Sequence, residues 1–226
     1  MDVHDVSQAS EYIKLLQKQK QVLQNAQSRK GQTPEPTKSR DEIIMHFMFL
    51  KMSAIGETKH QHFVRSSFVP PAYRPSVASL SDLKKVLFKD LTLENHHRGS
   101  YVLVRAVTPA HRMTAIMAVV EDERGDVLTL QLYNHEPGLD TDGRLVEGAV
   151  ILLKEPYLKV MADGNSGLRV DHLSDVMFIS DHDSLVPSVW RVLPNSNTSA
   201  MAWKTKGNGF FNQSAYHLAI AWYGLN

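Results

Sequence analysis

The chain has 226 residues, of which 42% are apolar and 22% charged, and it contains no cysteine. This length suits one domain with appendages, and the lack of cysteine excludes disulfides, thiolate zinc sites and a cysteine nucleophile. The formal net charge is +1, but residues 98–181 carry 8 Lys/Arg against 13 Asp/Glu, net −5. A surface that binds nucleic acid is normally built from clustered Lys/Arg, so this central region has the opposite charge balance.

The N-terminus, MDVHDVSQAS, has neither the basic nor the apolar region of a secretory signal. The longest clean apolar stretch, AIMAVV at 115–120, is far shorter than the roughly 20 residues of a membrane span. We therefore expect an intracellular protein, cytoplasmic or nuclear, with no membrane association.

Residues 1–40 are predicted to form a helical arm and a linker. Residues 7–28 are all helix-tolerant, and the pair Leu15/Leu16 recurs seven positions later as Val22/Leu23. About two heptads are short for a coiled coil. The arm therefore serves either for docking or dimerisation, or it is a solvated helix. The linker, residues 29–40, is rich in proline and polar residues.

Residues 41–97 are predicted to be a helical lead-in. The segment 41–56 restarts a helix, with Asp41 and Glu42 at its positive N-terminal end. Residues 68–76 contain three prolines and must be extended or turning. A short helix is expected over 79–91, because four apolar residues recur on one face.

From Gly99 onward the pattern changes from helix to strand, since β-branched and aromatic residues dominate. Pro156 lies inside the fourth expected strand and predicts a bulge or an edge there. Five such strands, with an insertion between the third and fourth, are typical of a small closed barrel of the OB type over 98–181. An open meander sheet is the alternative. In all, six segments show the strand pattern, one more than such a barrel needs: 100–107, 113–122, 126–134, 149–163, 168–172 and 175–180.

After a linker at 182–199, residues 200–226 match the start of a tetratricopeptide repeat (TPR), with Gly and Ala where two antiparallel helices approach closely. The predicted fold is therefore α+β: an OB-like small β-barrel preceded by helices and followed by a single TPR-type helical hairpin. Such a repeat spans about 34 residues and needs neighbours, so we expect the chain to continue and the hairpin to favour self-association. The motif residues are Trp203, Gly207, Phe210, Tyr216, Ala219 and Tyr223.

Residues 80–226, through the runs LTLENHHRGSYVLVRAV, LKEPYLKVMADGNSGLRVDHLSDVMFI and WKTKGNGFF, resemble the N-terminal portion of fungal proteins with tetratricopeptide repeats and a C-terminal SET domain. The resemblance implies longer relatives that transfer methyl groups from S-adenosylmethionine to lysine. No segment of this chain matches a SET domain, and without cysteine it has no NHSC-like motif.

Other catalytic and metal signatures are absent from the sequence. The 11 histidines show no spacing typical of zinc sites, and neither a phosphate loop nor a nucleophile elbow is present. Glu121, Asp122 and Glu123 cluster at a predicted hairpin tip, where water would keep their pKa values ordinary. We predict no catalytic, cofactor-binding or metal-binding residue and no cofactor.

The sequence thus predicts a non-catalytic protein-interaction module, with a protein as its partner and no enzymatic activity. One alternative is the regulatory region of a lysine methyltransferase whose SET domain lies downstream. The other is a barrel that binds single-stranded nucleic acid through aromatic platforms and nearby cations. Those residues would be Tyr101, Tyr133, Tyr157, Arg105, Arg112, Lys154 and Lys159.

Overall fold

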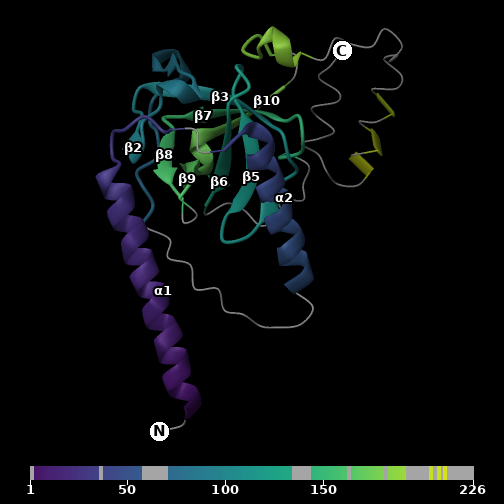
Figure 1. Ribbon diagram of the computed structural model, residues 1–226. Coiled ribbons are helices and arrows are strands. Elements are labelled where there is room, and N and C mark those ends of the chain that lie inside the picture. The colour runs from purple at the N-terminus through teal and green to yellow at the C-terminus, as the bar shows by residue number, and fades with distance from the viewer. Residues whose placement is uncertain are drawn as a thin grey trace.

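The computed structural model describes residues 3–35, 38–57, 71–133, 144–161, 164–180 and 183–191, with six further residues at 204–205, 208–209 and 211–212. Within these ranges two α-helices, α1 (Val3–Ser28) and α2 (Arg40–Glu57), precede ten strands that form one mixed sheet (Figure 1). Both helices were expected from the sequence, at 7–28 and 41–56.

The sheet is built mostly from antiparallel neighbours, in the order β10-β7-β3-β5-β6-β9-β8-β2, with β1 on β3 and β4 on β5. Only β1–β3 and β6–β9 are parallel among the described strand pairs. The strands are β1 (Lys84–Lys85), β2 (Asn95–His96), β3 (Ser100–Ala106), β4 (His111–Arg112), β5 (Ile116–Glu121), β6 (Val127–Leu132), β7 (Val150–Lys154), β8 (Tyr157–Val160), β9 (Ser166–Val170) and β10 (Val176–Ile179).

The prediction of a closed OB-like barrel is wrong, because the sheet is open and has β10 and β2 as its two ends. The reason lies at Glu155 and Pro156, in the middle of the strand expected at 149–163. Glu155 has a φ of 45°, and Pro156 has no N–H to donate. The strand therefore divides into β7, which pairs with β3 and β10, and β8, which pairs with β9 and β2.

The two faces of the sheet bury separate apolar cores. Along β7, Ile151 and Leu153 belong to the larger core, whereas Leu152 belongs to the smaller one. The period of two in a strand explains this division. The smaller core is covered by Val186 and Trp190, from the segment that contains η4 (Ser188–Trp190).

The helix predicted over 79–91 is also wrong. This segment forms η1 (Leu80–Asp82), the short strand β1 and η2 (Phe88–Asp90). Two main-chain hydrogen bonds to the β3 side, Lys84 N–H to Gly99 O and Val86 N–H to Tyr101 O, hold it extended. Tertiary pairing thus overrides the local helical pattern.

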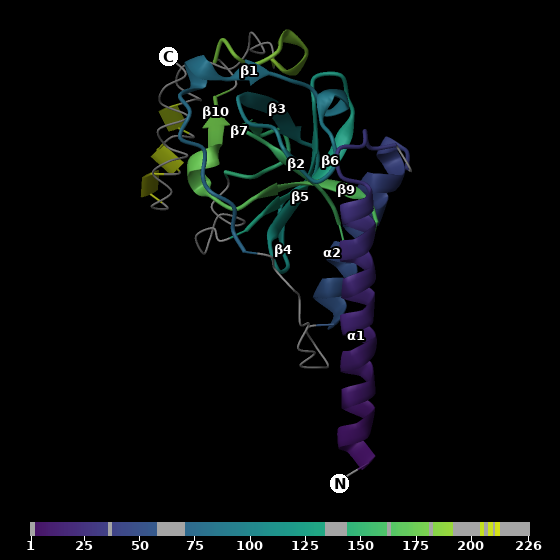
Figure 2. The same cartoon turned by 90° about the vertical axis from the view of Figure 1, so that its left-hand side faces the viewer.

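The helices relate differently to the sheet. Helix α2 lies against β5 and β6 and buries Phe47. Helix α1 contacts the body near its C-terminal end, where Ala26 joins the larger core, and projects away from it (Figures 1 and 2). Within the described ranges, no helix is long and apolar enough to cross a membrane.

The fold is thus mostly β, and the helices α1 and α2 both precede the sheet. This architecture contradicts the predicted combination of an OB-like barrel with a TPR-type hairpin. The six residues of the predicted repeat motif themselves lie outside the described residues: Trp203, Gly207, Phe210, Tyr216, Ala219 and Tyr223.

Candidate functional site

One half of the sheet carries a row of polar and aromatic side chains across four strands, which we call the polar row. The register pairs Gln131 of β6 with Arg169 of β9, Arg169 with Tyr157 of β8, and Tyr157 with His96 of β2. Paired residues share a face of the sheet. Their neighbours along each strand face the other side of the sheet, where residues such as Leu132 and Leu158 pack in the larger core.

Arg169 is the charged centre of the polar row. Its Nε donates to Asp171 Oδ1 at 2.8 Å, and both side chains are almost completely buried. Its guanidinium also lies 5.4 Å from the ring centroid of Tyr133, and the ammonium of Lys159 lies 5.9 Å from the same centroid. Burial, and then the nearby charge of Arg169, lower the pKa of Lys159. Two cations thus share one aromatic ring.

Tyr73 is the centre of an aromatic cluster beside the polar row. Its ring centroid lies 4.5 Å from that of His96, 5.4 Å from His172 and 6.3 Å from Tyr157. Burial raises the pKa of Tyr73 well above its ordinary value. Burial also raises the pKa of Tyr157, whose hydroxyl donates to Glu94 at 2.7 Å.

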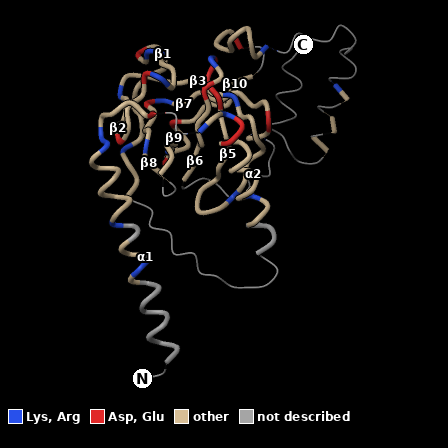
Figure 3. The backbone as a smooth tube through the Cα atoms, in the orientation of Figure 1, with Lys and Arg blue, Asp and Glu red and all other residues tan. Residues whose placement is uncertain are grey.

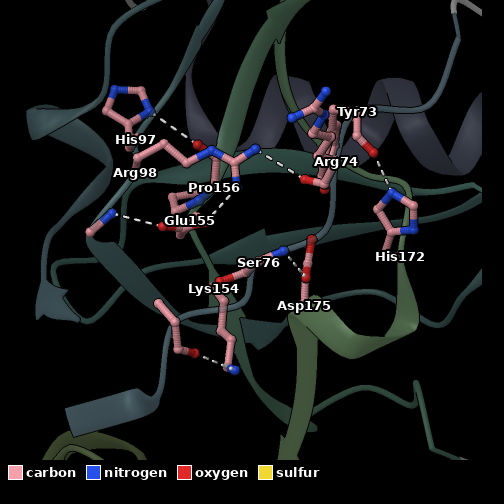
Figure 4. A network of polar contacts seen from close by, with 12 residues as sticks. Tyr73, Arg74, Ser76, His97, Arg98, Lys154, Glu155, Pro156, His172 and Asp175 are labelled. Carbon is pink, nitrogen blue, oxygen red and sulfur yellow. Dashed lines mark hydrogen bonds and ion pairs between the residues drawn. The ribbon is translucent and has the colours of Figure 1, made fainter. Parts of the chain in front are cut away.

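Residues 71–78, which we call the strap, cross this end of the sheet without joining it. Within the strap no residue is assigned to a helix or strand, and side chains bind its main chain (Figure 4). The contacts are Arg169 to Pro71 O (3.1 Å), Tyr73 N to Asp171 (3.1 Å), His172 Nε2 with Tyr73 O, Arg98 to Arg74 O (3.0 Å), Ser76 N to Asp175 (2.9 Å) and Lys154 to Ala78 O (2.9 Å).

Glu155 is linked to the strap through Arg98, which donates both to its carboxylate and to Arg74 O. Its carboxylate accepts hydrogen bonds from Arg98 at 2.5 Å and from Gly99 N at 3.0 Å. Burial alone would raise the pKa of Glu155, but these bonds outweigh burial and lower it. The Ser76 hydroxyl is close enough to contribute to that lowering, although it does not reach hydrogen-bond geometry.

Three buried polar atoms in this region have no hydrogen-bond partner among the described residues. They are Ser76 Oγ, His96 Nε2 and Asp175 Oδ2. Burial, and then the charge of Arg98, lower the pKa of His96, so its neutral form is favoured. Such atoms are uncommon in folded proteins, and each one costs free energy.

The carboxylates expected at a hairpin tip do lie at the turn between β5 and β6, but two of them are buried rather than exposed to water. Glu121 is 4% exposed and binds both Arg40 of α2 and Arg105 of β3. Burial opposes these bonds, yet the two arginines prevail and lower the pKa of Glu121. Asp122 is 1% exposed and accepts hydrogen bonds from main-chain N–H groups, and burial raises its pKa. The expected ordinary pKa values are wrong because both side chains are buried.

The structure separates the residues of the expected nucleic-acid surface. Tyr133, Tyr157 and Lys159 lie together near the polar row, whereas Tyr101 and Lys154 form a pair between β3 and β7. Positive and negative residues are interspersed over the sheet (Figure 3). In the described ranges, no group of three His, Asp or Glu residues could hold a metal ion.

Sequence reasoning missed most of the polar row and the strap contacts. Tyr73 lies almost 100 positions before Arg169 and Asp175 in the sequence. None of these three residues belongs to a spacing motif. The sequence signal was the dipeptide Asp171-His172, at the end of the strand expected over 168–172. Both residues bind the strap.

No family model matches the chain. A protein named "Methyltransferase" from Gibberella zeae is 35% identical to it over 213 residues. The match covers 92% of this chain and 27% of the relative, so the chain spans about a quarter of the length of that protein.

This relative contradicts the prediction of a non-catalytic protein-interaction module and the prediction that the protein is not an enzyme. The similarity extends over nearly the whole chain, including the strap and every strand of the sheet, rather than over a short shared repeat.

Proposed function

We propose that this chain works as part of a methyltransferase. The observation that carries the proposal is the 35% identity to the Gibberella zeae methyltransferase over 92% of the chain. The resemblance to fungal SET-domain proteins supports S-adenosylmethionine as the methyl donor and lysine as the acceptor. We place the chain's contribution to the reaction at the polar row and the strap.

This placement rests on the electrostatics of the region. His96, Lys159 and Tyr157 all have pKa values shifted first of all by burial. Shifted pKa values concentrate at functional sites, because the burial and charges that shift them also prepare groups for binding and proton transfer. In the described part of the chain, His96 and Tyr157 form one ring cluster with Tyr73. Lys159 adjoins this cluster, with its ammonium against the ring of Tyr133.

The described residues do not fit the methyl donor itself. Binding the ribose of an adenosyl group normally uses a carboxylate with free oxygens. The buried carboxylates Glu121, Glu155 and Asp171 are each bonded to arginine, and Asp122 is bonded to main-chain N–H groups. Asp175 keeps Oδ2 without a partner among the described residues, but its side chain is inaccessible to a ligand, since the residue is 1% exposed and its Oδ1 accepts a hydrogen bond from Ser76 N of the strap. We therefore propose that the donor is bound elsewhere in the methyltransferase.

A segment exchange tests the proposal. In the Gibberella zeae protein, the matching segment is replaced by this chain, and transfer of tritiated methyl groups from S-adenosylmethionine to a histone mixture is measured. We expect the chimera to retain transfer and a deletion of the segment to abolish it. Arg169→Met in the chimera should lower kcat/KM by about tenfold or more.

Lys85→Met is the matched control, since it also removes one ion pair of the sheet, with Glu123, but lies outside the polar row. It should leave transfer unchanged. Transfer that survives deletion of the whole segment would contradict the proposal.

A further inference from the structure

The strap is held in the way that a protein holds a bound peptide. Its six main-chain contacts come from side chains rather than from a strand ladder, and they involve both donors and acceptors. Arg98, Lys154 and Arg169 donate to carbonyl oxygens, while Asp171 and Asp175 accept from N–H groups. Only a peptide main chain offers carbonyl and N–H groups in this alternation.

Tyr73 is the anchor of the strap. Its ring is surrounded by those of His96, Tyr157 and His172, and its hydroxyl accepts a hydrogen bond from Asp171 N at 3.1 Å. The residues on either side, Ala72 and Arg74, are exposed. Tyr73 is half-buried, and an aromatic side chain packed into a pocket beside a bound main chain is a usual element of extended-peptide recognition.

We propose that the side chains under the strap form a recognition groove for an extended peptide with an aromatic anchor, and that the strap occupies it within the same chain. The groove consists of His96, Arg98, Lys154, Tyr157, Arg169, Asp171, His172 and Asp175. The groove shares His96, Tyr157 and Arg169 with the site that we propose for methyl transfer, but it is argued from binding contacts alone, and peptide binding can be measured without that reaction.

The buried atoms without hydrogen-bond partners indicate which side chain would let a peptide bind the groove more tightly than the strap does. Ser76 follows the anchor by three positions, and its Oγ, Asp175 Oδ2 and His96 Nε2 are all buried without a hydrogen-bond partner among the described residues. A side chain with two N–H donors at this position, such as asparagine, can supply the missing hydrogen bonds. The groove therefore favours a partner with an aromatic residue followed three positions later by an amide side chain.

A labelled peptide with the sequence of residues 69–79, VPPAYRPSVAS, tests the groove. Its binding to the full 226-residue chain and to the Tyr73→Ala variant is measured by fluorescence anisotropy. The strap of the unchanged chain competes at the high effective concentration of a tethered segment. We expect the variant to bind the peptide at least tenfold more tightly than the unchanged chain does.

A peptide that itself carries Tyr73→Ala is the matched control and should bind neither protein. The peptide with Ser76→Asn should bind the variant more tightly than the original peptide. Equal binding of the original peptide to both proteins would overturn the proposal, as would no binding to a variant with an unchanged β-type circular dichroism spectrum.

Amide hydrogen exchange of the strap in the unchanged chain is a second test of the groove, and it does not require the Tyr73→Ala variant to fold. The amides of Tyr73 and Ser76 donate to Asp171 and Asp175, so they should be protected. Excess Ser76→Asn peptide should displace the strap and increase the exchange rates of both amides at least threefold. Unchanged rates at millimolar peptide would overturn the proposal.

Discussion

At the scale of single residues, the protein buries polar atoms among the aromatic rings at the edge of its sheet. His96 is the clearest case, since its ring lies against Tyr73 and Tyr157 and its Nε2 has no partner among the described residues. A neutral imidazole tolerates this environment better than a charged one does. The stability of the protein should therefore depend on the charge of this ring.

We predict that His96 makes the protein less stable at mildly acidic pH. Its pKa is lowered in the folded state, so the unfolded chain binds the proton first as the pH falls below about 6.5. The free energy of unfolding should decrease from there until the pH reaches the folded-state pKa. Urea unfolding at pH 7.5, 6.5 and 5.5 measures this decrease.

His96→Phe keeps an aromatic ring but removes the titrating group, so its stability should change less than that of the unchanged chain between pH 7.5 and 5.5. The carboxylates with lowered pKa, Glu121 and Glu155, should contribute only at lower pH, where they become protonated. Identical pH profiles for both proteins above pH 5.5 would contradict this role of His96.

At the scale of elements, a buried carboxylate attaches α2 to the sheet. Glu121 of β5 binds Arg40 of α2 at 2.8 Å and also Arg105 of β3, whose guanidinium lies 5.6 Å from the Trp190 ring. The helix, two strands and the cover of the smaller core therefore meet at one side chain. Arg40 and Arg105 are partly exposed, so solvent screens part of this attraction.

Replacing Glu121 by glutamine should destabilise the protein by about 2 kcal/mol, because two arginines lose their shared anion at a buried position. Thermal or urea unfolding measures the loss. Lys85→Met, which breaks the more exposed pair with Glu123, should cost less than about 1 kcal/mol. Equal losses for the two variants would show that burial of Glu121 does not matter.

At the scale of the whole molecule, two cores share the same strands. Leu152 and Leu153 are adjacent on β7, face opposite sides of the sheet and are each at most 1% exposed. In a closed barrel with one interior, one of these side chains would face outward. In the open sheet both are interior residues.

Leu152→Ala and Leu153→Ala should therefore destabilise the protein alike, each by about 2–4 kcal/mol. Because both cores depend on β7, each variant should still unfold in a single transition at a lower temperature. Differential scanning calorimetry tests this. A Leu152→Ala variant as stable as the unchanged chain would mean that the smaller core contributes nothing.

The sequence by itself determined most local elements of this protein, with the segment 79–91 as the exception. Helices at 7–28 and 41–56 and the main strands follow from residue periodicity, which acts between near neighbours. The hairpin turn was predictable at Gly125, whose φ of 86° suits glycine. At Pro156 the sequence indicated an interruption, although not its consequence.

Only the tertiary structure decided how these elements combine. Whether the break at Glu155 and Pro156 bends one strand or separates two depends on partners far along the chain, and β8 pairs with β9 and β2. The meeting of Tyr73 with His172 likewise joins segments 99 positions apart. Local patterns carry no record of such contacts, because burial and pairing are settled only when the whole chain packs.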